Sequence, residues 1–145
     1  MIGIIITGHA NFGSGLLSSL KLIAGSPDNV YAVDFLEGHS VEDLEKNINE
    51  KIDVLLTNGV KDILILSDLL GGSPFKTSVE MKMKSKTNIE VISGTNLGML
   101  IEVSMAKGFI EDINDLVNIA INTGKDQVYR YEYTEKVQED VEEGI

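Results

Sequence analysis

Two short stretches of this sequence carry the side chains best suited to chemistry. The first is Gly8-His9, at the end of an apolar run, and the second begins with Asp68 and continues through Gly71-Gly72-Ser73. Imidazole titrates near neutral pH, so a neutral histidine can attack a phosphoryl group and later leave from it. A carboxylate that accepts a hydrogen bond from one ring nitrogen frees the other nitrogen to attack. The pattern favours His9 as a nucleophile oriented by Asp68.

The turn after Asp68 has the composition of an anion pocket. Gly71 and Gly72 allow the backbone to approach a ligand closely, and Ser73 is expected to cap the helix that follows. The N-terminus of a helix offers unpaired amide donors and the positive end of its dipole, so it can hold a phosphoryl group without a lysine. We therefore assign phosphoryl binding to these three residues, and we expect neither a metal nor a cofactor.

Each of these residues also has an ordinary structural explanation. A single histidine after a strand is more often a loop residue than a nucleophile, and aspartate often forms turns. His39 follows a glycine at the entry to a helix, and for it the structural explanation is preferred. Residues 13–15 lack the spacing of a dinucleotide fingerprint and the lysine of a P-loop, which disfavours nucleotide binding. Only the combination of His9, Asp68 and the glycine turn points to function.

The apolar pattern predicts the elements that would bring these residues together. Short β-branched or apolar runs, typical of strands in a parallel sheet, cover residues 2–7, 30–35, 63–66 and 89–93. Apolar positions at helical spacing predict helices from residue 12 to a stop at 25–27, and over 40–57, 75–83, 97–107 and 114–123. This alternation predicts a doubly wound α/β fold, with a mainly parallel four-stranded sheet and helices on both faces.

The predicted sheet places the chemical residues at one edge. Ligands of such sheets bind at the carboxyl ends of the strands, where His9, Asp68 and residues 94–96 fall. Residues 127–133 alternate enough to predict a last, antiparallel strand, which needs a partner edge because no crossover helix follows it. We divide the chain into a domain of residues 1–133 and an acidic tail of residues 134–145.

Composition narrows the possible functions. The 145 residues suit one domain with one core, and the absence of cysteine excludes disulfide and thiol chemistry. A net charge of -11 disfavours nucleic-acid binding, which needs a basic surface. No signal peptide and no apolar run of transmembrane length are evident, so a cytoplasmic protein is expected.

Taken together, these motifs resemble the mannose-family enzyme IIA component of the bacterial phosphoenolpyruvate-dependent sugar phosphotransferase system. The specific part is the Gly-Gly-Ser-Pro-Phe turn after an aspartate. Supporting matches are Gly8-His9, Val33-Asp34-Phe35, Gly38, Gly94, Asn96, Met99-Leu100 and Glu102. The chain departs from the family pattern at Thr7, where a glycine is frequent, and at Gly98, where a proline is common.

The resemblance implies a function and a set of partners. His9 is expected to carry a phosphoryl group received from HPr and passed to an enzyme IIB, so that the membrane components IIC and IID are involved only indirectly. Asp68 is expected to hydrogen-bond His9, and Ser73 to form part of the phosphoryl pocket. A homodimer that exchanges its last strand is also implied.

The surface around the site predicts how a partner docks. HPr presents basic residues around its own histidine in this family, so the acidic balance of the chain would steer the encounter. Four apolar residues close to the motifs are expected to form the contact patch: Phe12, Leu69, Leu70 and Phe75.

Three alternatives remain open at the level of the sequence. A non-catalytic regulatory module of the same fold would keep the pocket and dock to a transporter or regulator. A flavodoxin-like flavin binder would use residues 7–14 as its phosphate loop, but Asp68 would then be unexplained. A receiver-type domain would need an acidic cluster for Mg²⁺ where His9 stands.

Overall fold

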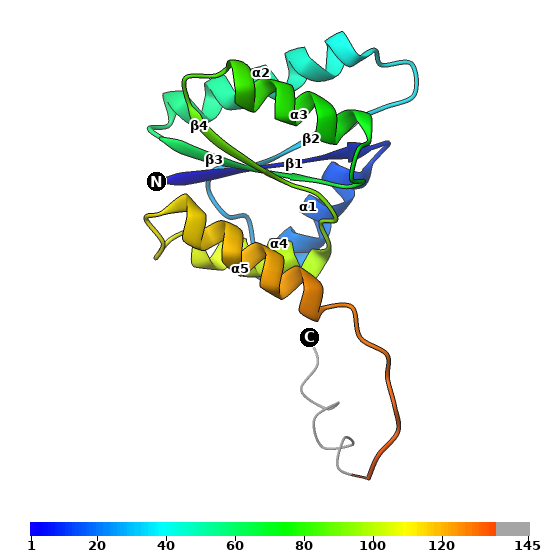
Figure 1. The fold of residues 1–145 in the computed structure, drawn as a ribbon. Coiled ribbons are helices and arrows are strands. Elements are labelled where there is room, and N and C mark those ends of the chain that lie inside the picture. The colour runs from blue at the N-terminus through cyan, green and yellow to red at the C-terminus, as the bar shows by residue number, and fades with distance from the viewer. Residues whose placement is uncertain (136–145) are drawn as a thin grey trace.

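The computed structural model describes residues 1–135, which form a three-layer α/β sandwich (Figure 1). The elements in chain order are β1 (Ile2–His9), α1 (Phe12–Ala24), β2 (Val30–Phe35), α2 (Val41–Thr57), β3 (Asp62–Ser67), α3 (Ser73–Lys84), β4 (Asn88–Ile92), α4 (Leu97–Ala106) and α5 (Ile113–Asp126). All four strands are parallel, in the order β2-β1-β3-β4. The doubly wound α/β prediction is thus confirmed for the sheet and its helices.

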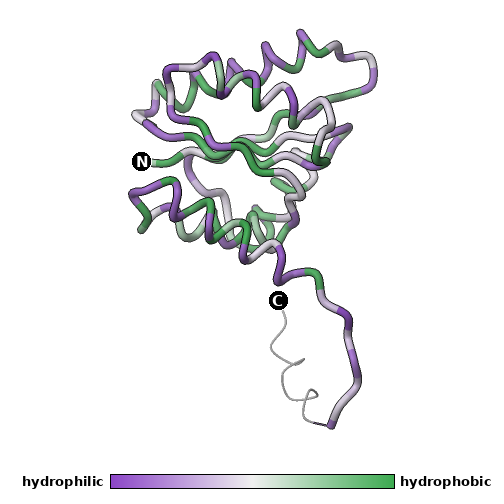
Figure 2. The backbone as a smooth tube through the Cα atoms, in the orientation of Figure 1, coloured by the Kyte–Doolittle hydropathy of each residue, from purple (hydrophilic) through white to green (hydrophobic). Residues whose placement is uncertain are grey.

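The sheet separates two hydrophobic cores. Successive side chains of a strand point to opposite faces. Ile4 and Ile6 therefore pack with residues of α1, α4 and α5, whereas Ile5 packs with residues of α2 and α3. Figure 2 shows the apolar colour concentrated along the strands and on the inner helix faces. Because β1 is central and covered on both sides, it reads as a continuous apolar run that ends in an exposed histidine.

Local sequence signals set several helix boundaries. Ser40 and Asp43 form a reciprocal capping box at the start of α2, as their spacing predicts.

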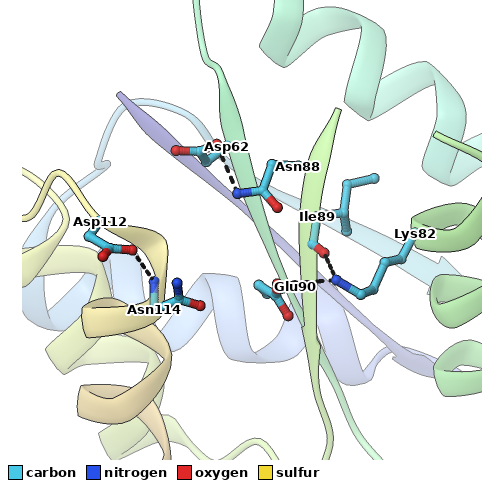
Figure 3. A network of polar contacts seen from close by, with 7 residues as sticks. All are labelled: Asp62, Lys82, Asn88, Ile89, Glu90, Asp112 and Asn114. Carbon is cyan, nitrogen blue, oxygen red and sulfur yellow. Dashed lines mark hydrogen bonds and ion pairs between the residues drawn. The ribbon is translucent and has the colours of Figure 1, made fainter. Parts of the chain in front are cut away.

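Lys82 of α3 donates hydrogen bonds to the Ile89 carbonyl at 2.7 Å and to the Glu90 carboxylate at 3.1 Å (Figure 3). These two bonds connect α3, the helix that follows the glycine turn, with the edge strand β4.

Two predictions about helix ends are wrong. Gly72, and not Ser73, is the N-cap of α3, and no side chain caps this helix. Ser73 is the first helical residue and Pro74 the second, still in the first turn, where the missing N–H of proline has no intrahelical partner to lose. The last helix does not stop at residue 123, as predicted, but continues to Asp126: Gly124 is a buried residue within α5, where the absence of a Cβ admits the side chain of Met99.

The predicted last strand is not seen. Gln127 and Val128 still donate from their amides to the last turn of α5, and residues 127–133 form no strand. Figure 1 shows the chain after α5 running away from the sandwich. Val128, Tyr129 and Tyr131 are largely exposed on it. Alternation of side chains alone does not make a strand, because the backbone also needs an edge to pair with. Most of the predicted acidic tail, residues 136–145, lies outside the described residues.

Among the helices of residues 1–135, none is both long enough and apolar enough to cross a bilayer.

Candidate functional site

His9 and Asp68 meet at the carboxyl edge of the two central strands. β1 pairs with β3 so that Thr7 lies opposite Ser67, and the next residues of each strand leave the sheet together. Asp68 Oδ2 accepts hydrogen bonds from the His9 backbone amide at 2.9 Å and from His9 Nδ1 at 2.8 Å. Because an ionised carboxylate only accepts, the proton of the neutral ring lies on Nδ1. The lone pair of Nε2 is therefore free to attack.

The electrostatics of the pair keep the carboxylate charged. Burial alone would raise the pKa of Asp68, but the hydrogen bonds from the backbone and ring of His9 outweigh it, so that the pKa lies below its ordinary value. The side chain of Asp68 is 14% exposed and that of His9 is 48% exposed. The ring also makes an edge contact with Phe35, with 6.0 Å between ring centroids. The histidine is thus accessible to a reactant, while its partner is shielded.

The glycine turn brings the N-terminus of α3 against the imidazole. Gly71 has a φ of +81°, a conformation that glycine adopts without strain. A Cβ at Gly72 would lie 2.9 Å from His9 Cε1, so only glycine leaves room for the ring. The Gly72 amide donates a hydrogen bond to the Leu69 carbonyl at 3.0 Å. The next donors along the chain that could bind a ligand are the amide and hydroxyl of Ser73. The three predicted phosphoryl-binding residues therefore have different structural roles around one ring.

A second turn, between β1 and α1, follows His9 directly in the chain. Ala10 has a φ of +51°, and its amide donates to the Phe35 carbonyl at 2.8 Å. Asp34 accepts a hydrogen bond from the Ser14 amide at 2.9 Å and another from the Ser14 hydroxyl. The Asp34 carboxylate on β2 thus caps α1. The N-cap residue itself, Asn11, makes no side-chain capping bond. Sequence reasoning missed this role of Asp34, although its position within an apolar strand was the signal.

The loop after β4 supports the main chain of Asp68. The Gly94 amide donates to the Asp68 carbonyl at 2.7 Å, and the Thr95 amide donates to the Ser67 carbonyl at 3.2 Å. Asn96 then caps α4 through a bond from the Met99 amide at 3.0 Å. Residues 94–96 were predicted to lie at this edge of the sheet, and the structure places them there.

The four predicted contact residues differ in exposure. Leu69 and Leu70 are 62% and 73% exposed, at the tip of the turn beside His9. Phe12 and Phe75 are half-buried. Phe12 packs against Gly8, where a Cβ would lie within 3 Å of its ring. Leu36, which the sequence did not single out, is exposed directly after β2. Three leucines, Leu36, Leu69 and Leu70, are therefore the more exposed apolar side chains at this edge, compared with Phe12 and Phe75.

His39 has a structural partner. Its Nδ1 accepts a hydrogen bond from the Leu36 amide at 3.1 Å, which closes the turn before α2. Its proton on the neutral ring is consequently on Nε2, the opposite arrangement from His9. Within residues 1–135, no group of three or more His, Asp or Glu side chains could hold a metal ion.

Comparison with protein families and solved structures gives consistent matches. The family model described as "PTS system fructose IIA component" matches residues 3–121. A phosphotransferase system component EIIA from Streptococcus agalactiae has 37% identity and a TM-score of 0.82, covering 90% of this chain and 97% of its own. The mannose/sorbose specific IIA subunit from Enterococcus faecalis is alike in fold, with a TM-score of 0.77 at 21% identity over 92% of this chain and 96% of its own.

Curated sequences give relatives of two lengths. The PTS system mannose-specific EIIAB component of Escherichia coli (strain K12) is 34% identical over 127 residues, which are 88% of this chain and 38% of the relative. The PTS system sorbose-specific EIIA component of Lacticaseibacillus casei is 30% identical over 102 residues, which are 70% of this chain and 71% of the relative. This chain thus spans 38% of the length of the first curated relatives that it matches.

Proposed function

This chain belongs to the EIIA-man family of sugar phosphotransferase system components, and from that premise we propose that it is a phosphohistidine carrier. His9 accepts a phosphoryl group from phospho-HPr and passes it to an enzyme IIB, which phosphorylates the incoming sugar. The observation that carries the proposal is the paired hydrogen bonding of His9 to Asp68, which leaves Nε2 free beside the N-terminus of α3. Exchange with HPr and enzyme IIB takes place in the cytoplasm.

The geometry suits an in-line phosphoryl transfer. As the bond between Nε2 and phosphorus forms, the bond between phosphorus and the donor breaks, and the proton stays on Nδ1. The ring becomes positively charged, and the Asp68 carboxylate at 2.8 Å stabilises that charge. The Ser73 amide and hydroxyl, at the positive end of α3, bind the phosphoryl oxygens. Transfer to enzyme IIB is the same step in reverse with another acceptor.

The partners dock on the edge that carries His9. Leu69 and Leu70 form the exposed part of the proposed contact patch, and Phe12 and Phe75 support it from partly buried positions. The same edge serves donor and acceptor in turn, because both must reach Nε2.

We further propose that the protein is a homodimer in which residues 127–133 pair with the partner copy. The exposed side chains of Val128, Tyr129 and Tyr131, which follow the last helix, support the proposal. We assign the function to residues 1–133 and set the acidic residues 134–145 apart from this domain on their sequence alone. Sedimentation of the full chain should give a dimer, and a chain ending at residue 126 should be shifted towards monomer. A monomeric full chain at high concentration would contradict the exchange.

Phosphoryl transfer can be tested with purified components. Incubation with phosphoenolpyruvate, enzyme I and HPr should label the protein, and the label should be labile in acid and stable in base. His9→Ala should abolish the label while leaving the fold intact. His39→Ala is the matched control, because it removes the other histidine, which is engaged in a turn, and it should keep the label. A wild-type protein that folds, binds HPr and takes no label would instead indicate a regulatory module.

A further inference from the structure

Asn96 makes two hydrogen bonds of different kinds from a single side-chain amide. Its Oδ1 accepts from the Met99 amide at 3.0 Å, which caps α4. Its Nδ2 donates to the Gly124 carbonyl of α5 at 2.9 Å. Serine or aspartate would cap α4 as well as asparagine does. Only the amide also supplies the N–H for the second bond, so the bond to α5 is what distinguishes asparagine at this position.

The loop that contains Asn96 also fixes the main chain on both sides of the Asp68 side chain. Gly94 and Thr95 donate from their amides to the carbonyls of Asp68 and Ser67, at 2.7 Å and 3.2 Å. These two carbonyls belong to the peptide groups before and after the Asp68 Cα. A displacement of the loop would therefore rotate the carboxylate that holds His9.

The end of α5 is a firm anchor for this loop. Gly124 is buried, and a Cβ at this position would lie 2.6 Å from the terminal methyl of Met99, so α4 and α5 are in close contact here. The Gly124 carbonyl is one of the last four of the helix, which lack an intrahelical partner. Asn96 supplies that missing donor. The side chain of Gln127 packs in the same way against Gly98, in the first turn of α4.

We propose that Asn96 is a positioning residue for the His9–Asp68 pair. By joining the loop after β4 to the end of α5, it holds the main chain from which Asp68 reaches the imidazole. It touches neither the histidine nor a reactant. The proposal rests on the phosphocarrier function for its kinetic consequence, but its structural consequence, the tautomer of His9, can be measured without any partner.

The first measurement is the ring-nitrogen NMR spectrum, which reports which ring nitrogen carries the proton. His9 carries its proton on Nδ1 and His39 on Nε2, so the two histidines of the chain have opposite signatures and His39 is an internal reference. Asn96→Ser keeps the cap acceptor and removes the donor to α5. We expect His9, and not His39, to move towards a mixture of tautomers in this variant.

Two further variants make this measurement specific. Asn88→Ser is the matched control: it makes the same change at the other end of β4, where the Asn88 side chain donates to Asp62 at 3.2 Å (Figure 3). It should leave both histidines unchanged. Asn96→Asp keeps size and cap but removes the donor, and it covers the case in which Asn96→Ser fails to fold. An unchanged His9 signature in a folded Asn96 variant would overturn the proposal.

The second measurement is the rate of phosphorylation by phospho-HPr. In Asn96→Ser, the maximal rate should fall about 10-fold, the effect expected of a residue that orients a reacting group. The dependence on HPr concentration should not change, because Asn96 is not part of the contact patch. A wild-type protein that takes no label, together with the expected NMR result, would contradict the carrier function alone. A labelled wild type whose Asn96 variants match it in rate and NMR signature would contradict the positioning role alone.

Discussion

At the scale of single residues, one carboxylate oxygen determines what His9 can do. Asp68 Oδ2 binds the backbone amide and the ring nitrogen of the same residue, so the ring is oriented relative to its own main chain. The lowered pKa of Asp68 means that the carboxylate stays charged wherever the imidazole is neutral. A charged acceptor enforces one tautomer, whereas a neutral amide could bond to either.

Asp68→Asn tests this orientation directly. The amide has nearly the same shape but can donate as well as accept, so both tautomers of His9 become possible. We expect the rate of phosphorylation by phospho-HPr to fall about 10- to 100-fold in a folded protein. Asp62→Asn, at the opposite end of β3, is the matched control and should retain the wild-type rate. An equal rate in Asp68→Asn would assign Asp68 to the turn alone.

The same pair makes the stability of the fold depend on pH in acid. The pKa of Asp68 is lower in the folded protein than its ordinary value of 3.8, so its ionised form stabilises the fold above that value. This contribution is lost as the pH falls through the folded pKa. Urea unfolding should show wild type more stable than Asp68→Asn by about 1 kcal/mol at neutral pH. The difference should shrink below pH 3.8; a difference that grows in acid would contradict the assignment.

At the scale of elements, the sequence predicted the features that follow from apolar patterning and missed the role of Asp34 and the pairing state of the last segment. Apolar runs located the four strands, because burial on both faces requires them. The position of Asp34 inside such a run had no local explanation, since its partner is the N-terminus of α1. Residues 127–133 alternate like a strand, but pairing depends on an edge that the pattern does not contain. The meeting of His9 with Asp68 was predictable because both follow strands of a parallel sheet.

The glycine turn before α3 allows a prediction that separates backbone strain from crowding of the site. Gly72 has a φ of -72°, which any residue adopts, but an added Cβ would press on the His9 ring at 2.9 Å. Gly72→Ala should therefore slow phosphorylation of His9 strongly with little loss of stability. Gly71→Ala is the reciprocal control: nothing lies within 4 Å of its Cβ, but its φ is +81°. It should cost about 1–2 kcal/mol of stability, measured by urea unfolding. If Gly72→Ala kept full activity, α3 would not stand against the ring as described.

At the scale of the whole molecule, helices cover both faces of the sheet and the proposed site lies at one edge. α1, α4 and α5 lie on one face and α2 and α3 on the other (Figure 1). His9, Leu69 and Leu70 are exposed where β1 and β3 end. The chain carries a net charge of -11. Long-range attraction therefore acts on any basic partner, while the leucines act only after contact.

The effect of this charge on the proposed encounter with HPr can be measured through the second-order rate of phosphorylation at limiting HPr. The rate should fall as salt rises, because screening shortens the range of attraction to about 8 Å at physiological ionic strength. Glu37→Lys reverses an exposed charge just after β2, near the His9 edge, and should lower the rate further at low salt. Glu111→Lys makes the same change beside Met1, at the opposite end of β1, and should have a smaller effect. A rate indifferent to salt, or equal in the two variants, would mean that docking depends on the apolar patch alone.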